Sequence, residues 1–213
     1  MKDNLKWLIL LPVLGIVIVL AIFIPRLVSS DSSASDNSAT SQNNQVVQQQ
    51  IDQDKTTITN YQDLTKKNPG DQLALRKLGD TFADLGDLQS QEGKINDAAW
   101  SYKWAVDQYR QYLKLNSGDT EVRIDLGYTY TQLNMGDVAM RELQTAVAQQ
   151  PNNQRGWLNI GYLDLQTGKV DESKAPLQKA IALGASSQYG QDAKQLLDQA
   201  NNGGTQNLVP VTP

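Results

Sequence analysis

The 213-residue chain contains no cysteine and no histidine. The absence of cysteine excludes disulfides, thiolate nucleophiles and cysteine-ligated zinc sites. The absence of histidine removes the most common general base and the most common metal ligand. The sequence also lacks P-loop, G-x-S-x-G, H-E-x-x-H and EF-hand spacings. We therefore expect no catalytic residues, no metal site and no cofactor, and a hydrolase built on two carboxylates is the chemical alternative that the composition leaves open.

Basic side chains are also scarce. The chain has 19 Lys and Arg against 23 Asp and Glu, a net charge of −4, and its largest basic cluster is Lys66-Lys67. Nucleic-acid-binding proteins normally present a basic face. The charge distribution therefore argues against a nucleic acid as the partner.

Charge is absent from one long run near the N-terminus. Residues 7–25, WLILLPVLGIVIVLAIFIP, contain no charged, hydroxyl or amide side chain. As a helix they would span about 28 Å, which is close to the hydrocarbon thickness of a bilayer. A cleaved signal peptide usually has a shorter apolar region, so the run predicts a retained signal anchor, with cleavage after residues 28–30 as the alternative.

The charges that flank this run predict its orientation. Lys2 and Lys6 precede it, whereas Arg26 alone follows it closely. The positive-inside rule then gives a cytoplasmic N-terminus and an extracytoplasmic remainder. We expect residues 1–28 to anchor a single-pass protein in the cell membrane, most simply that of a bacterium.

Segments poor in apolar residues lie at both ends of the remaining chain. Residues 29–45 are rich in Ser, Asn and Gln and contain no aromatic or basic residue. Such a composition buries too little apolar surface to offset the entropy lost on ordering, so we expect a disordered tether. Residues 203–213 are predicted to be a disordered tail.

An internal repeat with a period of 34 residues organises the rest. Leu126-Gly127-Tyr128 matches Ile160-Gly161-Tyr162, Leu143 matches Leu177, and Ala146 matches Ala180. The period and these residues resemble the tetratricopeptide repeat family, whose pattern is W-x2-L-G-x2-Y, then A-x3-F, then P. A further copy opens at Leu75-x2-Leu78-Gly79-x2-Phe82.

The resemblance implies an all-α protein, a right-handed α-solenoid of about three helical hairpins with flanking helices. The solenoid would cover residues 46–202, comprising a lone helix at 46–68, a lengthened repeat at 71–116, repeats at 119–151 and 153–184, and a capping helix at 186–201. The first repeat is lengthened because Gly79 and its equivalent Gly127 are 48 residues apart instead of 34. One heptad added to each helix would preserve both packing faces.

In this family the first helix of each hairpin lines a concave groove that holds the ligand. Carried over by this resemblance, the groove positions are Arg76, Asp80, Asp84, Tyr128, Thr131, Gln132, Arg155, Asn159, Tyr162 and Gln166. An ordinary solvated face is the alternative for each of them. The subclass that grips a C-terminal carboxylate is disfavoured, because Asp80 and Asp125 stand where that subclass needs Asn.

The lengthened repeat carries an unusual number of aromatic residues. Trp100 and Trp104 are four residues apart and share a helix face. They either pack in the core against residues 46–64 or form a surface for a partner or a second copy of the chain.

The leading functional hypothesis is a non-catalytic, membrane-anchored interaction scaffold with a protein or peptide partner. The layout resembles bacterial single-pass proteins of this family, which assist export, folding or assembly of envelope proteins. A structural accessory subunit of one stable membrane complex, bound through the helix that bears Trp100, is the second hypothesis. A homo-oligomer and the carboxylate-dyad hydrolase are the other possibilities left open.

Overall fold

The computed structural model describes the backbone of residues 35–203 and the side chains of residues 45–203. The predicted anchor at 7–25 and most of the tail at 203–213 lie outside this range. None of the helices it describes is both long and apolar enough to cross a membrane.

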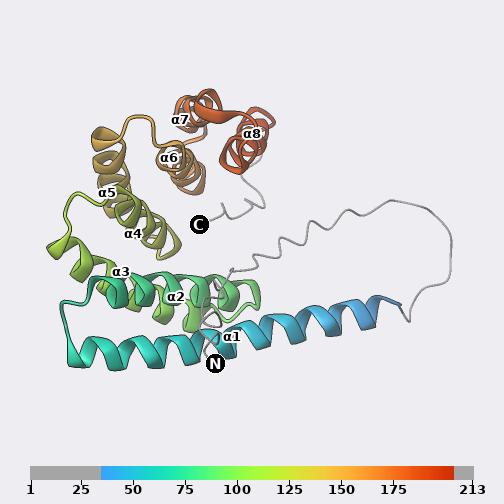
Figure 1. Ribbon diagram of the computed structural model, residues 1–213. Coiled ribbons are helices and arrows are strands. Elements are labelled where there is room, and N and C mark those ends of the chain that lie inside the picture. The colour runs from blue at the N-terminus through green and yellow to red at the C-terminus, as the bar shows by residue number, and fades with distance from the viewer. Residues whose placement is uncertain (1–34, 204–213) are drawn as a thin grey trace, which may run out of the picture. The chain divides into compact units, whose positions relative to one another are not determined.

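Eight α-helices and no strand make up the described part of the chain, which confirms the all-α prediction (Figure 1). They are α1 (Ser35–Lys67), α2 (Gln72–Gln91), α3 (Ile95–Leu115), α4 (Thr120–Gln132), α5 (Gly136–Gln149), α6 (Gln154–Gln166), α7 (Val170–Gly184) and α8 (Gln188–Asn201). Helices α2 and α3, α4 and α5, and α6 and α7 form three hairpins, and each hairpin stacks on the next. Helix α8 packs on both α6 and α7.

The first hairpin is longer than the others, in agreement with the two inserted heptads. Helices α2 and α3 have 20 and 21 residues, whereas α4 and α5 have 13 and 14. Each helix of the first hairpin therefore extends by two turns without rotating its buried face.

Helix α1 begins at Ser35, earlier than the predicted start at residue 46, so the helix takes in part of the predicted tether at 29–45. Residues 35–45 contain neither Pro nor Gly, so nothing in them stops the helix from extending toward the N-terminus. Its apolar face is narrow: Ile51 and Ile58 are buried in the main core, and Val47 and Tyr61 pack against that core.

Glycine sets the distance between the two helices of each regular hairpin. A Cβ atom on Gly127 would lie 2.7 Å from Cδ2 of Leu143, and one on Gly161 would lie 2.5 Å from Cγ of Leu177. Both leucines are fully buried. The equivalent glycines of the repeat therefore let the second helix of each hairpin pack directly against the first.

The first helix of each hairpin, and α8, begins at a side-chain cap. Asp71, Asp119, Asn153 and Ser187 accept hydrogen bonds from backbone N–H groups three residues further on. These caps satisfy donors that helix geometry leaves unpaired. They fix where α2, α4, α6 and α8 begin.

Candidate partner-binding groove

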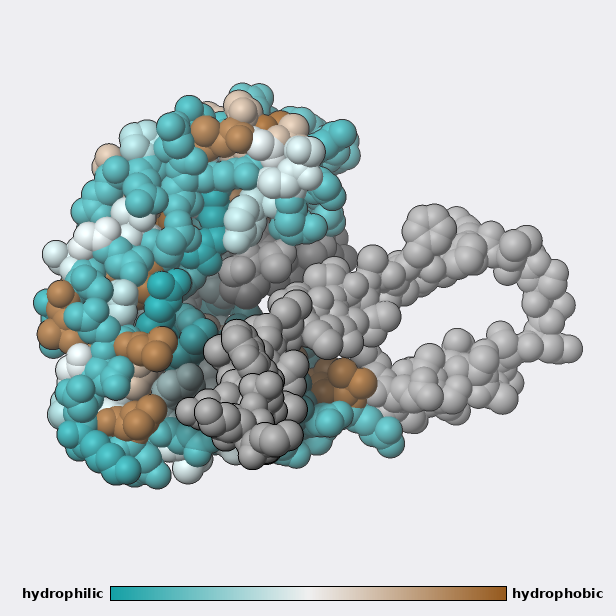
Figure 2. All heavy atoms as spheres, in the orientation of Figure 1, coloured by the Kyte–Doolittle hydropathy of each residue, from teal (hydrophilic) through white to brown (hydrophobic). Residues whose placement is uncertain are grey.

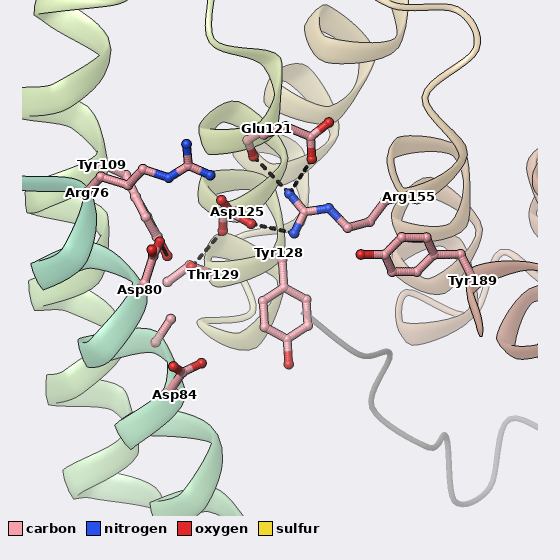
Figure 3. Close-up of a pocket in the computed structure, with 11 residues that line it drawn as sticks. Arg76, Asp80, Asp84, Tyr109, Glu121, Asp125, Tyr128, Thr129, Arg155 and Tyr189 are labelled. Carbon is pink, nitrogen blue, oxygen red and sulfur yellow. Dashed lines mark hydrogen bonds and ion pairs between the residues drawn. The ribbon is translucent and has the colours of Figure 1, made fainter. Parts of the chain in front are cut away.

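A pocket of about 310 Å³ lies between the first helices of the hairpins and α8 (Figure 3). Helices α2 and α4 supply most of its walls, α6 supplies Arg155, and α8 supplies Tyr189. The pocket is lined by Arg76, Asp80, Ala83, Asp84, Tyr109, Glu121, Asp125, Tyr128, Thr129, Arg155 and Tyr189. Charged and aromatic side chains dominate this surface.

Arg155 ties α6 to α4 at one wall of the pocket. Its Nη1 lies 2.6 Å from Oδ1 of Asp125, and its Nη2 lies 3.0 Å from Oε2 of Glu121. The Arg155 side chain is 11% exposed. Its positive charge is thus already shared between two carboxylates of the protein.

Three carboxylates follow one another along α2, at positions 80, 84 and 87. Asp87 accepts hydrogen bonds from the hydroxyls of Tyr102 at 2.6 Å and Tyr128 at 3.1 Å. Asp80 accepts a hydrogen bond from the hydroxyl of Tyr109 at 3.2 Å and lies 3.8 Å from Nζ of Lys77. Asp84 has no hydrogen bond or ion pair with any described residue.

The pKa of the Asp84 carboxyl is strongly raised. Burial by the groove walls and, after it, repulsion from the carboxylates at 54, 87, 80 and 125 together raise its pKa from 3.8 to about 7. The residue is nevertheless exposed to solvent. The repulsive contribution is therefore the one that added salt, or a cationic ligand, would diminish.

The structure brings half of the predicted groove residues to the pocket. Arg76, Asp80, Asp84, Tyr128 and Arg155 line it. Of the other five, Thr131, Asn159 and Tyr162 are buried, whereas Gln132 is half-buried and Gln166 is exposed.

The buried members of the predicted set have local partners. The hydroxyl of Thr131 donates to the carbonyl of Gly127 at 3.1 Å, and Nδ2 of Asn159 donates to the carbonyl of Arg155 at 2.9 Å. Helix α6 lies between α4 and α8, which cover its flanks. These neighbouring helices therefore cover Asn159, which the repeat pattern places in the groove.

Several pocket residues were not predicted as groove positions. Glu121 is one of them, and it occupies the position equivalent to Arg155 one repeat earlier, since the two are 34 residues apart. Opposite charges at equivalent positions of successive repeats are a signal that the sequence does carry. Tyr189 could not be found this way because it lies beyond the repeats.

Trp100 and Trp104 lie on the outer face of α3 and are not covered by α1. Their exposed fractions are 64% and 49%. The ring of Trp104 stacks on that of Phe82 with 5.9 Å between centroids, and Nζ of Lys103 lies 5.1 Å from the centroid of Trp100. The structure therefore favours the surface interpretation over packing against residues 46–64.

No protein-family model and no curated protein sequence matches the chain. Among solved structures, the chain is similar to the tetratricopeptide repeat domain of Arabidopsis OM64, with 16% identity, a TM-score of 0.42, and coverage of 59% of this chain and 98% of that one. It is similar to MamA, with 19% identity, a TM-score of 0.47, and coverage of 68% and 81%. It is also similar to a tetratricopeptide repeat protein from Parabacteroides merdae, with 17% identity, a TM-score of 0.46, and coverage of 75% and 61%.

Two of these three structures, the OM64 domain and the Parabacteroides merdae protein, are described as tetratricopeptide repeat structures.

Proposed function

We propose that the chain is a non-catalytic interaction scaffold whose groove binds a partner segment carrying basic side chains. The observation that carries this proposal is the row of carboxylates on α2, in which Asp84 has no hydrogen-bond or ion-pair partner among the described residues. Arg155 is held by Asp125 and Glu121, and Arg76 lies 3.8 Å from Asp119, so neither of these cations pairs with Asp84.

A lysine or arginine of a partner would suit this pocket for two reasons. Its charge would remove the repulsion that raises the pKa of Asp84. Its aliphatic stem would pack on the side chains of Ala83, Tyr109 and Tyr128, which line the same pocket. An extended peptide or a partner helix could present such a side chain to the groove.

Membrane anchoring belongs to the same proposal and rests on residues 7–25. Their length and lack of charge support a helix that holds the repeats just outside the cytoplasmic membrane. A scaffold in that position would assist the export, folding or assembly of envelope proteins. Resistance to alkaline extraction and digestion of the repeats by protease added to spheroplasts would test this arrangement, and protection of the repeats would contradict it.

The groove is tested by measuring peptide affinity with the full chain in detergent. A flexible peptide with spaced lysines is compared with the same peptide carrying glutamate at those positions. We expect only the lysine peptide to bind, with an affinity that falls as salt rises. The double variant Asp80→Asn with Asp84→Asn should weaken binding at least tenfold, which corresponds to about 1.4 kcal/mol.

Asp198→Asn serves as the matched control, because Asp198 is an exposed carboxylate on α8 outside the pocket. Equal binding of the two peptides, or full binding by the double variant, would show that the carboxylates of α2 are not the recognition site.

A carboxylate-dyad hydrolase is the second candidate, and the pKa of Asp84 favours it. A carboxyl group that is half-protonated near pH 7 can act as a general acid beside an ionised carboxylate. Turnover of chromogenic glycosides that Asp84→Asn abolishes would establish this candidate. No group of three or more acidic side chains within the described residues is placed to hold a metal ion.

A further inference from the structure

We propose that the outer face of α3 binds the same face of a second copy of this chain about a two-fold axis. This face is distinct from the groove, so the dimer would leave both grooves open. It consists of Trp100, Lys103, Trp104, Asp107 and Arg110, which are all exposed. We call it the α3 face.

The α3 face combines apolar area with unpaired charge. Two tryptophans as exposed as these are unusual on a monomer, since large aromatic side chains contribute most when a partner covers them. Lys103, Asp107 and Arg110 form no ion pair with any described residue, and Nζ of Lys103 lies 5.1 Å from the centroid of the Trp100 ring. The face therefore holds exposed aromatic rings together with three charges that form no ion pair among the described residues of one copy.

The order of these residues makes the face complementary to itself. When two α3 helices pack antiparallel and cross at the level of residue 105, residues equally far before and after 105 face each other. Lys103 then lies opposite Asp107 of the second copy, and Asp107 lies opposite its Lys103. Trp100 lies opposite Arg110, which can pack on the indole ring as a cation–π pair. No two like charges of the face meet.

The same pattern disfavours the other occupants. A parallel pairing would place each charge against its own copy, which costs energy. An anionic lipid surface would attract Lys103 and Arg110 but repel Asp107 between them. An antiparallel second copy pairs Lys103 with Asp107 in both directions and gives Arg110 the ring of Trp100.

The surroundings of the face provide room for the partner's aromatic side chains. A pocket of about 370 Å³ adjoins the tryptophans, and its far wall consists of Tyr130, Leu133 and Met135. Met135 is itself 44% exposed. An indole side chain of the second copy could enter this pocket, where it would be covered together with Met135.

A contact made chiefly by one helix is small, so we expect a dimer with a micromolar dissociation constant rather than an obligate one. Two copies anchored in one membrane would meet at a high effective concentration, which favours such a weak contact.

Charge reversal tests the two-fold arrangement directly. The full chain is studied by analytical ultracentrifugation in detergent, alone and as mixtures. Lys103→Glu places acidic groups opposite each other, and Asp107→Lys does the same with basic groups. Each variant alone should dimerise about tenfold more weakly than the wild type, since two ion pairs become two repulsions. An equimolar mixture of the two variants should recover a heterodimer of wild-type affinity, because every opposed pair again has opposite signs.

Two further variants complete the measurement. Trp100→Ala with Trp104→Ala should weaken dimerisation about a hundredfold, and both positions are exposed enough for the helices to fold normally. Lys179→Glu changes the charge by the same amount on the exposed surface of α7 and should leave dimerisation unchanged. Far-ultraviolet circular dichroism of each variant confirms that the helices have formed.

Cysteine cross-linking gives an independent geometric test, because the natural chain has no cysteine. A chain with Lys103→Cys mixed with a chain with Asp107→Cys should form a mixed disulfide faster than either chain forms one with itself. A full chain that stays monomeric at 100 times the expected dissociation constant, or a mixture that recovers nothing, would overturn the proposal. So would a dimer that persists in the tryptophan variant, because another surface would then hold the copies together. Loss of a different bound protein in that variant, with self-association intact, would likewise assign the face to that partner and overturn the proposal.

Discussion

Arg155 on α6 donates a hydrogen bond from Nη1 to Oδ1 of Asp125 on α4, at 2.6 Å. The side chains are 11% and 15% exposed, so the pair connects two successive hairpins at a site that water barely reaches. Burial alone would lower the pKa of Arg155, but attraction from Asp125 and Glu121 outweighs it and raises the pKa. The guanidinium therefore stays charged and holds both carboxylates in place.

We predict that Arg155→Met lowers the free energy of unfolding by about 2–4 kcal/mol at pH 7, because it leaves two carboxylates without their cation. Methionine keeps most of the apolar stem, so the loss reports the charge. Urea denaturation followed by circular dichroism measures it. The double variant Arg155→Met with Asp125→Asn should lose less than the sum of the single losses, and a single loss below about 0.5 kcal/mol would show that the ion pair adds nothing to stability.

Gly161→Ala should destabilise the third hairpin. The new Cβ atom would lie 2.5 Å from Cγ of Leu177, a side chain that is fully buried and cannot move aside freely. We expect a loss of about 1–3 kcal/mol in thermal or urea unfolding. Gly118→Ala is the matched control, since nothing lies within 4 Å of its added methyl group, and it should change stability by no more than about 0.5 kcal/mol. Equal effects of the two substitutions would contradict the close packing of α6 and α7.

Stability should depend on pH through Asp84. Its pKa is about 7 in the folded protein, against 3.8 for the ordinary group. Between these values the unfolded chain releases a proton that the folded chain retains, so Asp84 makes the folded state less favourable as pH rises from about 4 to 7. Asp84→Asn should therefore raise the urea midpoint at pH 8 and leave it nearly unchanged at pH 4.

Salt should reduce this difference at pH 8, because repulsion between carboxylates contributes to the shift and the residue is open to solvent. An equal effect of Asp84→Asn at both pH values would contradict the raised pKa.

Helix α1 should depend on a few apolar anchors. Ile58→Ala truncates a side chain that is only 8% exposed. We expect it to weaken the packing of α1 on the first hairpin by about 2–4 kcal/mol of free energy. Amide hydrogen exchange in α1 should accelerate more than in α4 or α6, because stacked repeats transmit stability mainly to their neighbours. Val46→Ala is the control on the same helix, as Val46 is 60% exposed, and exchange in that variant should match the wild type.

Much of the fold could be predicted because the repeat is a local pattern. The 34-residue period, the glycine at positions 127 and 161, and the apolar spacing are properties of consecutive residues, and they are enough to predict paired helices. The lengthened hairpin was also within reach, since two added heptads keep the helical phase. The start of α1 could not be predicted, because a polar stretch without Pro or Gly contains no residue that marks where a flexible chain ends and a helix begins.

The groove could be predicted only in part, since the sequence indicates which helix face carries a residue but not what covers that face. Arg76 and Asp84 line the pocket, whereas Asn159 lies under the neighbouring helices on an equivalent stretch of α6. Likewise, the spacing of Trp100 and Trp104 placed them on one face and left open whether α1 would cover it.

Apart from the start of α1, the sequence by itself determined the helices of this protein, because helix length, capping and the contact between paired helices depend on residues that are near one another along the chain. The exclusion of disulfides and of histidine chemistry likewise follows from composition alone. The tertiary structure decided the properties to which residues far apart in the sequence contribute together. The pKa of Asp84 depends on carboxylates at positions 54, 80, 87 and 125, and the role of Arg155 depends on a partner one repeat away. These electrostatic interactions depend on distances in space, and only the folded chain sets those distances.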